Sequence, residues 1–204
     1  MEKEVAIREL SLLKKHTKNM RLAAEEWKSP WQILIAIILS ARTRDEKTIQ
    51  IAKRLFEKYP TAKDLAYANI DEVKKIIKPI NYCNNKSKHI ISCSRKIVEE
   101  YHGEVPHDEN ELLKLAGVGR KTTNVFLSEM GHDAIGVDTH VAYISQKFGW
   151  TENSNPDKIE NDLKSLFPKR YWRNLNATLV RFGKSNISKN NQNKLINEIK
   201  KKAE

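Results

Sequence analysis

Hydrophobic residues recur along this 204-residue chain at intervals of three and four, the spacing that places side chains on one face of an α-helix. Runs in which apolar and polar residues alternate, as in a half-buried strand, are scarce. Seven glycines and six prolines divide the helical pattern into segments. The pattern therefore predicts an all-α fold. The predicted helices span 3–16, 30–41, 46–58, 62–67, 70–77, 86–101, 108–114, 120–130, 138–148, 156–166 and 171–182.

The longest apolar run extends from Trp31 to Ala41. It is too short to span a bilayer and contains polar residues, so we interpret it as a buried helix and expect no membrane partner. The final stretch, 184–204, is rich in Lys and Asn, and its apolar residues are few. Leu195, Ile196 and Ile199 predict a helix or hairpin that closes a domain there. A frayed, solvated tail beyond about residue 198 is the alternative.

Lys and Arg outnumber Asp and Glu by 37 to 26, which gives a net charge of +11. This imbalance favours a polyanionic partner, although Lys-rich helices on an ordinary soluble protein also produce it. Two cysteines, Cys83 and Cys93, form no CxxC pair, so neither a structural zinc site nor a four-cysteine iron–sulfur cluster has its ligands within this chain. We expect no metal, no other cofactor and a reducing compartment, the cytoplasm.

Residues 111–130, ELLKLAGVGRKTTNVFLSEM, form the first motif with chemical content. An apolar helix ends at Leu115, Val118 lies between two glycines, and a basic helix follows. Glycines allow a tight turn, and the amides of the next helix N-terminus are donors for a phosphate. A simple helical hairpin in a bundle is the alternative. The full spacing of apolar helix, hairpin and Arg120-Lys121-Thr122 favours phosphate binding.

The second motif is IGVDTHV, residues 135–141, in which Asp138 stands where an apolar segment meets a new helix. The structural role of such a residue is an N-cap. Capping and catalysis are compatible, because a cap fixes the direction of the carboxylate. Thr139 and His140 are candidates either for capping or for phosphate contact.

Three ordered motifs, LSARTRD (39–45), LAGVGRKTTNVFL (115–127) and VDTHV (137–141), make residues 20–182 resemble the endonuclease III family of helix–hairpin–helix DNA glycosylases. The resemblance implies a two-lobed helical fold with DNA in a groove between the lobes, faced by the hairpin and Asp138. One domain would comprise 1–22 with 133–204, and a six-helix barrel would comprise 23–132.

In the family, the lysine after the hairpin is the nucleophile and the aspartate its essential partner, and these fall on Lys121 and Asp138. The resemblance places Arg42 and Tyr82 where a side chain fills the gap left by an extruded base. A surface phosphate contact for Arg42 and core packing for Tyr82 are the alternatives. The full set of expected DNA-binding residues is Leu115, Gly117, Val118, Gly119, Arg120, Thr122, Ser40, Arg42, Tyr82, Thr139, His140 and Lys184.

The chain departs from the family pattern in several places. FGKSNISKNNQNKL occupies the region where the family commonly carries its iron–sulfur loop, and no cysteine is present there. Ala116 replaces the hairpin proline, and Arg42 stands where Gln is common. The family segment GLYNSKA corresponds to NYCNNKS, residues 81–87, with Cys83 where the family often has Tyr.

The resemblance implies a monomeric bifunctional DNA glycosylase and abasic-site lyase of base excision repair. Its partner would be double-stranded DNA that contains damaged bases, oxidised pyrimidines above all, or abasic sites. A monofunctional glycosylase is one alternative, but such relatives generally lack the lysine found here as Lys121. A non-enzymatic helix–hairpin–helix DNA-binding module is another, but it has no need of Asp138.

Overall fold

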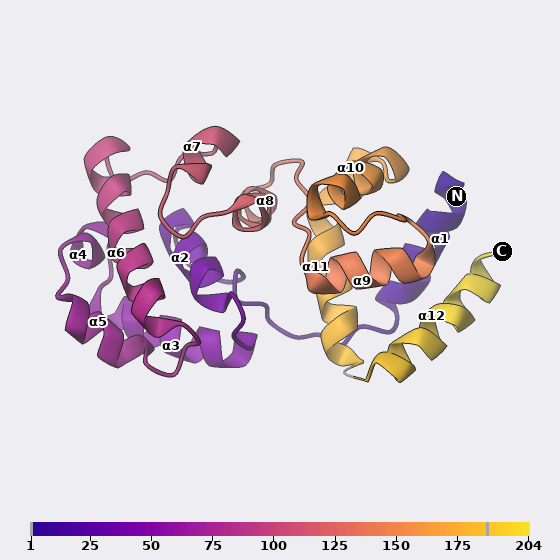
Figure 1. Ribbon diagram of the computed structural model, residues 1–204, viewed down its shortest axis with the longest axis horizontal. Coiled ribbons are helices and arrows are strands. Elements are labelled where there is room, and N and C mark those ends of the chain that lie inside the picture. Colours follow the sequence, from indigo (N-terminus) through magenta and orange to yellow (C-terminus); the bar gives the residue numbers. More distant parts are fainter. Residues whose placement is uncertain (1, 187) are drawn as a thin grey trace. The chain divides into compact units, whose positions relative to one another are not determined.

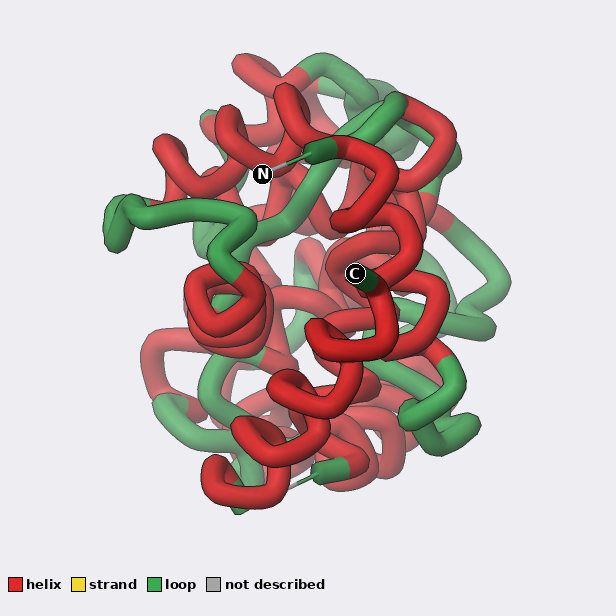
Figure 2. The backbone as a smooth tube through the Cα atoms, turned by 90° about the vertical axis from the view of Figure 1, so that its right-hand side faces the viewer, coloured by secondary structure: helices red, strands yellow, loops and turns green. Residues whose placement is uncertain are grey.

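The computed structural model describes residues 2–186 and 188–204, and its regular structure there is entirely helical (Figure 2). The all-α prediction is confirmed. The chain forms two compact units: the residues up to Met20 together with those from Gly131 onward, and Arg21–Met130 between them. Within the described part of the chain, no helix has the length and apolar character needed to cross a membrane.

The unit formed by Arg21–Met130 is built around the apolar helix α2, Pro30–Ser40 (Figure 1). Ser29 caps α2 and Pro30 occupies its first turn, as Pro does at helix starts. Packing against α3, α6 and α8 buries nearly all of α2, so the predicted buried helix is confirmed. The other helices of this unit are α3 (Asp45–Lys58), α4 (Ala62–Ala66), α5 (Ile70–Ile77), α6 (Cys83–Glu100), α7 (Glu109–Leu113) and α8 (Arg120–Glu129).

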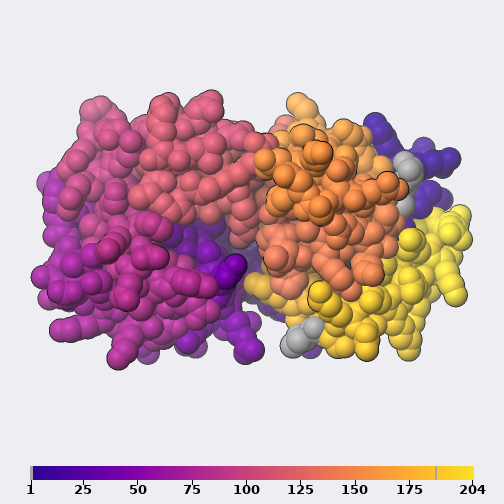
Figure 3. All heavy atoms as spheres, viewed as in Figure 1, coloured from indigo at the N-terminus to yellow at the C-terminus, as the bar shows by residue number. Residues whose placement is uncertain are grey.

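The second unit combines the two ends of the chain. It contains α1 (Lys3–Lys14), α9 (Thr139–Phe148), α10 (Pro156–Leu166), α11 (Lys169–Ser185) and α12 (Lys189–Ala203). Helix α12 packs against α1 and α9, and Figure 3 shows its outer side at the surface. Ile196 and Ile199 are fully buried in the core of this unit, and Leu195 packs against that core. The predicted closing helix is confirmed, and it continues to Ala203 rather than fraying after residue 198.

Several predicted helix boundaries are wrong. Helix α6 begins at Cys83 rather than 86, because Tyr82 adopts a left-handed conformation from which its carbonyl accepts from the amides of Asn85 and Lys86. Helix α11 spans Lys169–Ser185 rather than 171–182, and its apolar face is buried along this length. Asp138 lies outside α9, because its extended backbone makes it the N-cap and not the first helical residue.

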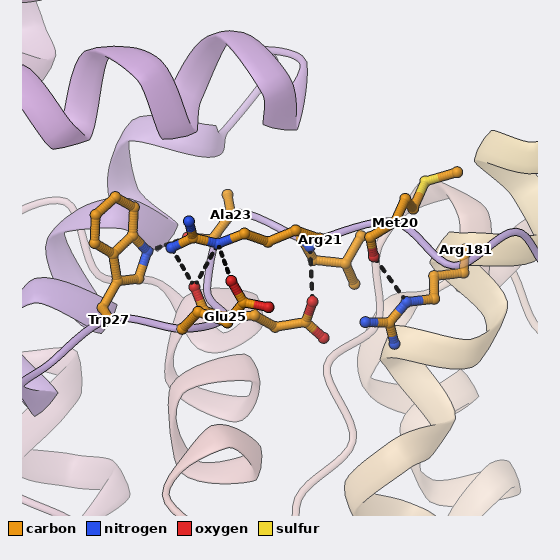
Figure 4. Close-up of polar contacts among 8 residues, drawn as sticks. Met20, Arg21, Ala23, Glu25, Trp27 and Arg181 are labelled. Atoms are coloured by element: carbon orange, nitrogen blue, oxygen red, sulfur yellow. Dashed lines mark hydrogen bonds and ion pairs between the residues drawn. The ribbon is translucent and has the colours of Figure 1, made fainter.

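The segment before α2 is held by local polar contacts (Figure 4). The Arg21 guanidinium donates to the Glu25 carbonyl at 2.8 Å and lies 4.6 Å from the centre of the Trp27 ring. The Trp27 indole N–H donates to the Ala23 carbonyl at 2.6 Å. In the other unit, Arg181 donates to the Met20 carbonyl at 3.1 Å. Each side of the boundary at residues 20 and 21 is therefore fixed within its own unit.

Candidate active site

The hairpin between α7 and α8 is held by two buried apolar side chains. Leu115 and Val118 are 3% and 7% exposed, and the Val118 amide donates to the Leu115 carbonyl at 3.1 Å. Gly117 has φ +79°, and a Cβ added there would lie 2.9 Å from the Cβ of His89. Both the backbone conformation and the close approach require glycine. The side chains of Leu115 and Val118 therefore shape the turn, so any DNA contact at these two positions is left to the backbone.

The N-terminus of α8 is open. Its N-cap is Gly119, which has no side chain to accept from the first amides of the helix. A Cβ added at Gly119 would meet nothing within 4 Å. Arg120, Lys121 and the half-buried Thr122 form the first turn, with no acidic residue among them. Free amides and two basic side chains make this helix end a suitable site for a phosphate.

Lys121 is half-buried on the first turn of α8. Arg120, beside it, forms an ion pair with Glu109 at 3.4 Å. Within the described residues, the Lys121 amine makes no hydrogen bond or ion pair. The rest of the helix, Thr123–Ser128, is buried, so α8 is anchored while Lys121 in its first turn stays partly accessible. This arrangement suits an amine that has to reach a substrate.

Asp138 is held in a defined orientation in the other unit. Its Oδ1 accepts from the amides of His140 and Val141, both at 2.9 Å. The preceding segment is buried, and the Asn176 side chain donates to the Gly136 carbonyl at 2.6 Å. Oδ2 has no hydrogen-bond partner among the described residues. The N-cap role is confirmed, and the second carboxylate oxygen remains available for a catalytic role.

Thr139, His140 and Lys184 lie near one another in the same unit. Thr139 is exposed, and the half-buried His140 ring lies against Gly183, where an added Cβ would come within 2.2 Å of Nδ1. Lys184 follows Gly183 in the last turn of α11. Thr139 adjoins His140 in the sequence and Lys184 adjoins Gly183, so the contact of the His140 ring with Gly183 brings these two chain segments together. Their contact with DNA stays a prediction.

Arg42 and Tyr82 form an exposed pair in the Arg21–Met130 unit. The Arg42 guanidinium donates to the Tyr82 hydroxyl at 3.0 Å and lies 5.9 Å from the centre of its ring. Tyr82 is 59% exposed, so the core-packing alternative for Tyr82 is wrong. Both residues have positive φ, 55° and 59°. Ser40, also expected at the DNA, is half-buried and donates its hydroxyl proton to the Ile37 carbonyl at 2.8 Å.

Lys86 is a residue that the sequence reasoning missed. Its ammonium is buried and donates to the carbonyls of Leu39 and Ala41 at 2.7 and 2.6 Å. Burial lowers the pKa of Lys86 to about 8. A signal was present, because Lys86 falls on the same helical face as Ile90 and Ile97, where the pattern otherwise calls for an apolar side chain.

The residues do not fit a four-cysteine iron–sulfur cluster. Both cysteines of the sequence, Cys83 and Cys93, are on α6 in the Arg21–Met130 unit. Cys93 is fully buried, and burial raises the pKa of its thiol to about 12, so it is a poor ligand. In the described residues, no three His, Cys, Asp or Glu side chains come together as metal ligands. The C-terminal region is closed instead by the apolar face of α12.

Comparison with known proteins identifies the family of this chain. Residues 35–169 match the HhH-GPD superfamily of base excision DNA repair proteins. Endonuclease III of Thermotoga maritima is 42% identical over 156 residues, which cover 76% of this chain and 73% of the relative. Endonuclease III of Synechocystis is 41% identical and covers 78% and 74%. The solved structure of a trapped endonuclease III–DNA covalent intermediate, an estranged-adenine complex, matches with a TM-score of 0.84 and 33% identity, covering 92% and 89%. This chain belongs to the endonuclease III family of HhH-GPD base excision DNA repair proteins.

Proposed function

We propose that this chain removes oxidised pyrimidines from duplex DNA with the Lys121 amine as nucleophile and Asp138 as its partner, and then cuts the strand. The chain is a DNA glycosylase and abasic-site lyase of base excision repair. One observation carries the residue assignment: Lys121 stands on the open first turn of a helix that follows a phosphate-binding type of hairpin. A related solved structure, that of a trapped endonuclease III–DNA covalent intermediate, supports it.

Phosphate binding at α8 brings the amine to the sugar. The uncapped amides of the helix N-terminus and the basic side chains of its first turn attract a backbone phosphate. A bound phosphate fixes the register of the strand relative to Lys121. The target base is unreachable inside the duplex, so the nucleotide has to be extruded. We assign the filling of the resulting gap to the exposed pair Arg42 and Tyr82.

The chemistry follows from one neutral amine. Lys121 Nζ bonds to C1′ as the glycosidic bond breaks, and the base leaves with a proton. Opening of the sugar ring converts the adduct into an imine between Lys121 and C1′. Loss of a C2′ proton then expels the 3′ phosphate by β-elimination, which breaks the strand. Water hydrolyses the imine and returns the lysine.

Asp138 assists where positive charge develops. Its carboxylate is fixed by the two amides that Oδ1 accepts from, so little reorganisation is needed when charge builds on the sugar. Oδ2 is the oxygen assigned to that charge and to the lysine proton. A capping aspartate thus serves the fold with one oxygen and the reaction with the other.

The proposed partner is double-stranded DNA, bound by a monomer, and the proposed location is the cytoplasm with the chromosome. The net charge of +11 supports a polyanionic partner. The curated relatives quoted above are bacterial endonucleases III.

Borohydride trapping tests the proposal. The protein is incubated with duplex DNA that contains an abasic site, sodium borohydride is added, and covalent complexes are separated on a denaturing gel. We expect a cross-link together with a nicked strand, because borohydride reduces the imine to a stable amine. A monofunctional glycosylase would release the base from a duplex containing thymine glycol but would not cross-link to the abasic duplex. A simple DNA-binding module would do neither.

A further inference from the structure

We propose that Lys86 is a positioning residue for base extrusion: its buried ammonium locks the turn that carries Arg42 beside the turn that carries Tyr82, so that the two side chains act as one preformed wedge. The inference rests on the proposed function, because it takes the extrusion of a nucleotide as given. It concerns a residue that touches neither the DNA nor the reacting atoms. We call Arg42 and Tyr82 together the wedge.

Lys86 joins the base of both turns. Lys86 lies in the first turn of α6, the helix that starts directly after Tyr82. Its amide donates to the Tyr82 carbonyl at 3.0 Å. Its side chain crosses to the end of α2, where the ammonium donates to the Leu39 and Ala41 carbonyls. The last carbonyls of a helix have no partner within the helix. Lys86 supplies that partner at the residue that immediately precedes Arg42.

The two turns are also connected at the surface. The Asn81 side chain donates to the Arg42 carbonyl, and the Asn81 amide donates to the Thr43 hydroxyl at 3.3 Å. The Arg42 guanidinium then reaches the Tyr82 hydroxyl at 3.0 Å. Hydrogen bonds from the buried Lys86 ammonium and from the exposed Asn81 therefore hold the same pair of turns.

Both wedge residues have a backbone that requires such support. Arg42 at φ 55° and Tyr82 at φ 59° occupy the left-handed region, which disfavours side chains with a Cβ. Conformations of this kind persist only when surrounding contacts determine them, and they cluster at functional sites. Without Lys86, the strained turn at Arg42 loses the donor that satisfies its neighbouring carbonyls.

Burying the Lys86 ammonium has a cost in stability. Lys86 is 6% exposed, and burial lowers its pKa to about 8. The folded protein therefore binds this proton less tightly than the unfolded chain, where the pKa is higher. The charge destabilises the fold at neutral pH, and this penalty declines as the pH rises above about 8. An apolar side chain of similar length would avoid that penalty but would leave the Leu39 and Ala41 carbonyls without this donor, so we assign the charge to holding the turn before Arg42.

A preformed wedge lowers the barrier to extrusion. Holding two side chains in their working geometry before binding removes the entropy loss that ordering them on the DNA would cause. The stacked duplex is the state that resists the enzyme, so loss of the wedge should affect duplex substrates. Single-stranded DNA already exposes its abasic sugar and needs no wedge.

The test compares Lys86→Met with Lys88→Met, an exposed lysine of the same helix that provides a control for the lost charge. Single-turnover excision is measured on duplex DNA containing thymine glycol, and borohydride trapping is measured on a single-stranded abasic oligonucleotide. We expect Lys86→Met to slow duplex excision at least about tenfold while trapping on the single strand stays near wild type. Lys88→Met should match wild type in both assays.

Extrusion of the base can be measured separately from its excision. In a Lys121→Ala background, 2-aminopurine placed opposite thymine glycol reports unstacking by a rise in fluorescence, and Lys86→Met should suppress that rise. Its effect should also overlap with that of Arg42→Ala, so that the double variant is no worse than the stronger single one. If wild type fails to trap on abasic DNA, the proposed function fails, whereas the fluorescence result still decides the role of Lys86.

Normal duplex excision by folded Lys86→Met would overturn the proposal, and so would equal losses on duplex and single-stranded DNA, which indicate general damage to the fold. Circular dichroism checks folding. If Lys86→Met does not fold, Lys86→Arg replaces it, since it keeps a cation but changes the reach and geometry of the donors. An unchanged ratio of duplex to single-strand activity in folded Lys86→Arg would then overturn the inference.

Discussion

The N-cap residues of helices α8 and α9 both have an extended backbone, Gly119 at φ −108° and ψ 177°, and Asp138 at φ −111° and ψ −173°. Any residue adopts this conformation, so the backbone does not require glycine at position 119. The two ends differ in what the side chain does. Asp138 accepts from two amides of its own helix, whereas Gly119 leaves the corresponding amides of α8 open. The same local geometry thus holds a fixed carboxylate in one unit and leaves amides uncapped, at the proposed phosphate site, in the other.

The proposed nucleophile, Lys121, is on the uncapped first turn of α8. The change Lys121→Ala tests this role and has the largest expected effect. We expect borohydride cross-linking to abasic DNA to disappear, because a single amine performs the attack. DNA affinity should remain near that of wild type, since many phosphate contacts share it. Lys114→Ala, at an exposed lysine before the hairpin, is the control and should cross-link normally. Full lyase activity in Lys121→Ala would reject the assignment.

Asp138→Asn separates the capping role of Asp138 from its proposed catalytic role. Asn is as good an N-cap as Asp, so the midpoint of thermal unfolding should change little. Base release should fall on the order of 100-fold or more, because the charge that stabilises the sugar is lost. Asp108 is a matched control, since its Oδ1 also accepts from two amides, at 2.9 and 3.1 Å. If Asp138→Asn unfolds the protein while activity per folded molecule survives, Asp138 is only a cap.

Gly119→Asp would convert the open end into a copy of the closed one. Its φ and ψ match those of Asp138, and an added Cβ meets no atom within 4 Å, so the fold should tolerate it. The new carboxylate should occupy the α8 amides and repel phosphate, which weakens DNA binding about tenfold, equivalent to about 1.4 kcal/mol. Fluorescence anisotropy measures this affinity. Gly119→Ala should bind nearly as wild type, and equal binding by Gly119→Asp would show that the end of α8 holds no phosphate.

The smallest expected effects come from lysines of α12, which test whether phosphate binding extends beyond α8. Lys194 and Lys201 are exposed on α12, the helix that occupies the C-terminal region without a metal. If each contacts a phosphate, its change to Gln should lower the slope of log affinity against log salt by about one unit. Glu198→Gln, on the same helix, should leave the slope unchanged. Slopes unchanged in both lysine variants would confine the contacts to other parts of the protein.

Much of the fold followed from periodicity and helix signals. Pro30 and the apolar stripes predicted α2 and α12, because these signals act within one or two helical turns. The start of α6 was misplaced because its polar first turn carries no apolar signal. What sets that start is the left-handed Tyr82, and a left-handed conformation in a tyrosine is not visible in the pattern.

For the candidate site, the motifs predicted Lys121, the hairpin and Asp138, because a basic residue after a glycine turn and a capping carboxylate are local arrangements. Two features needed tertiary structure. Gly117 is required partly by His89, which lies 28 positions earlier, and Lys86 reaches carbonyls more than 40 positions away in the chain. Such contacts depend on how α2, α6 and the hairpin pack together, and periodicity describes only single helices. The sequence by itself determined the helical class and the family and predicted the chemistry-bearing residues, while only packing decided which side chains hold the Arg42–Tyr82 pair in place.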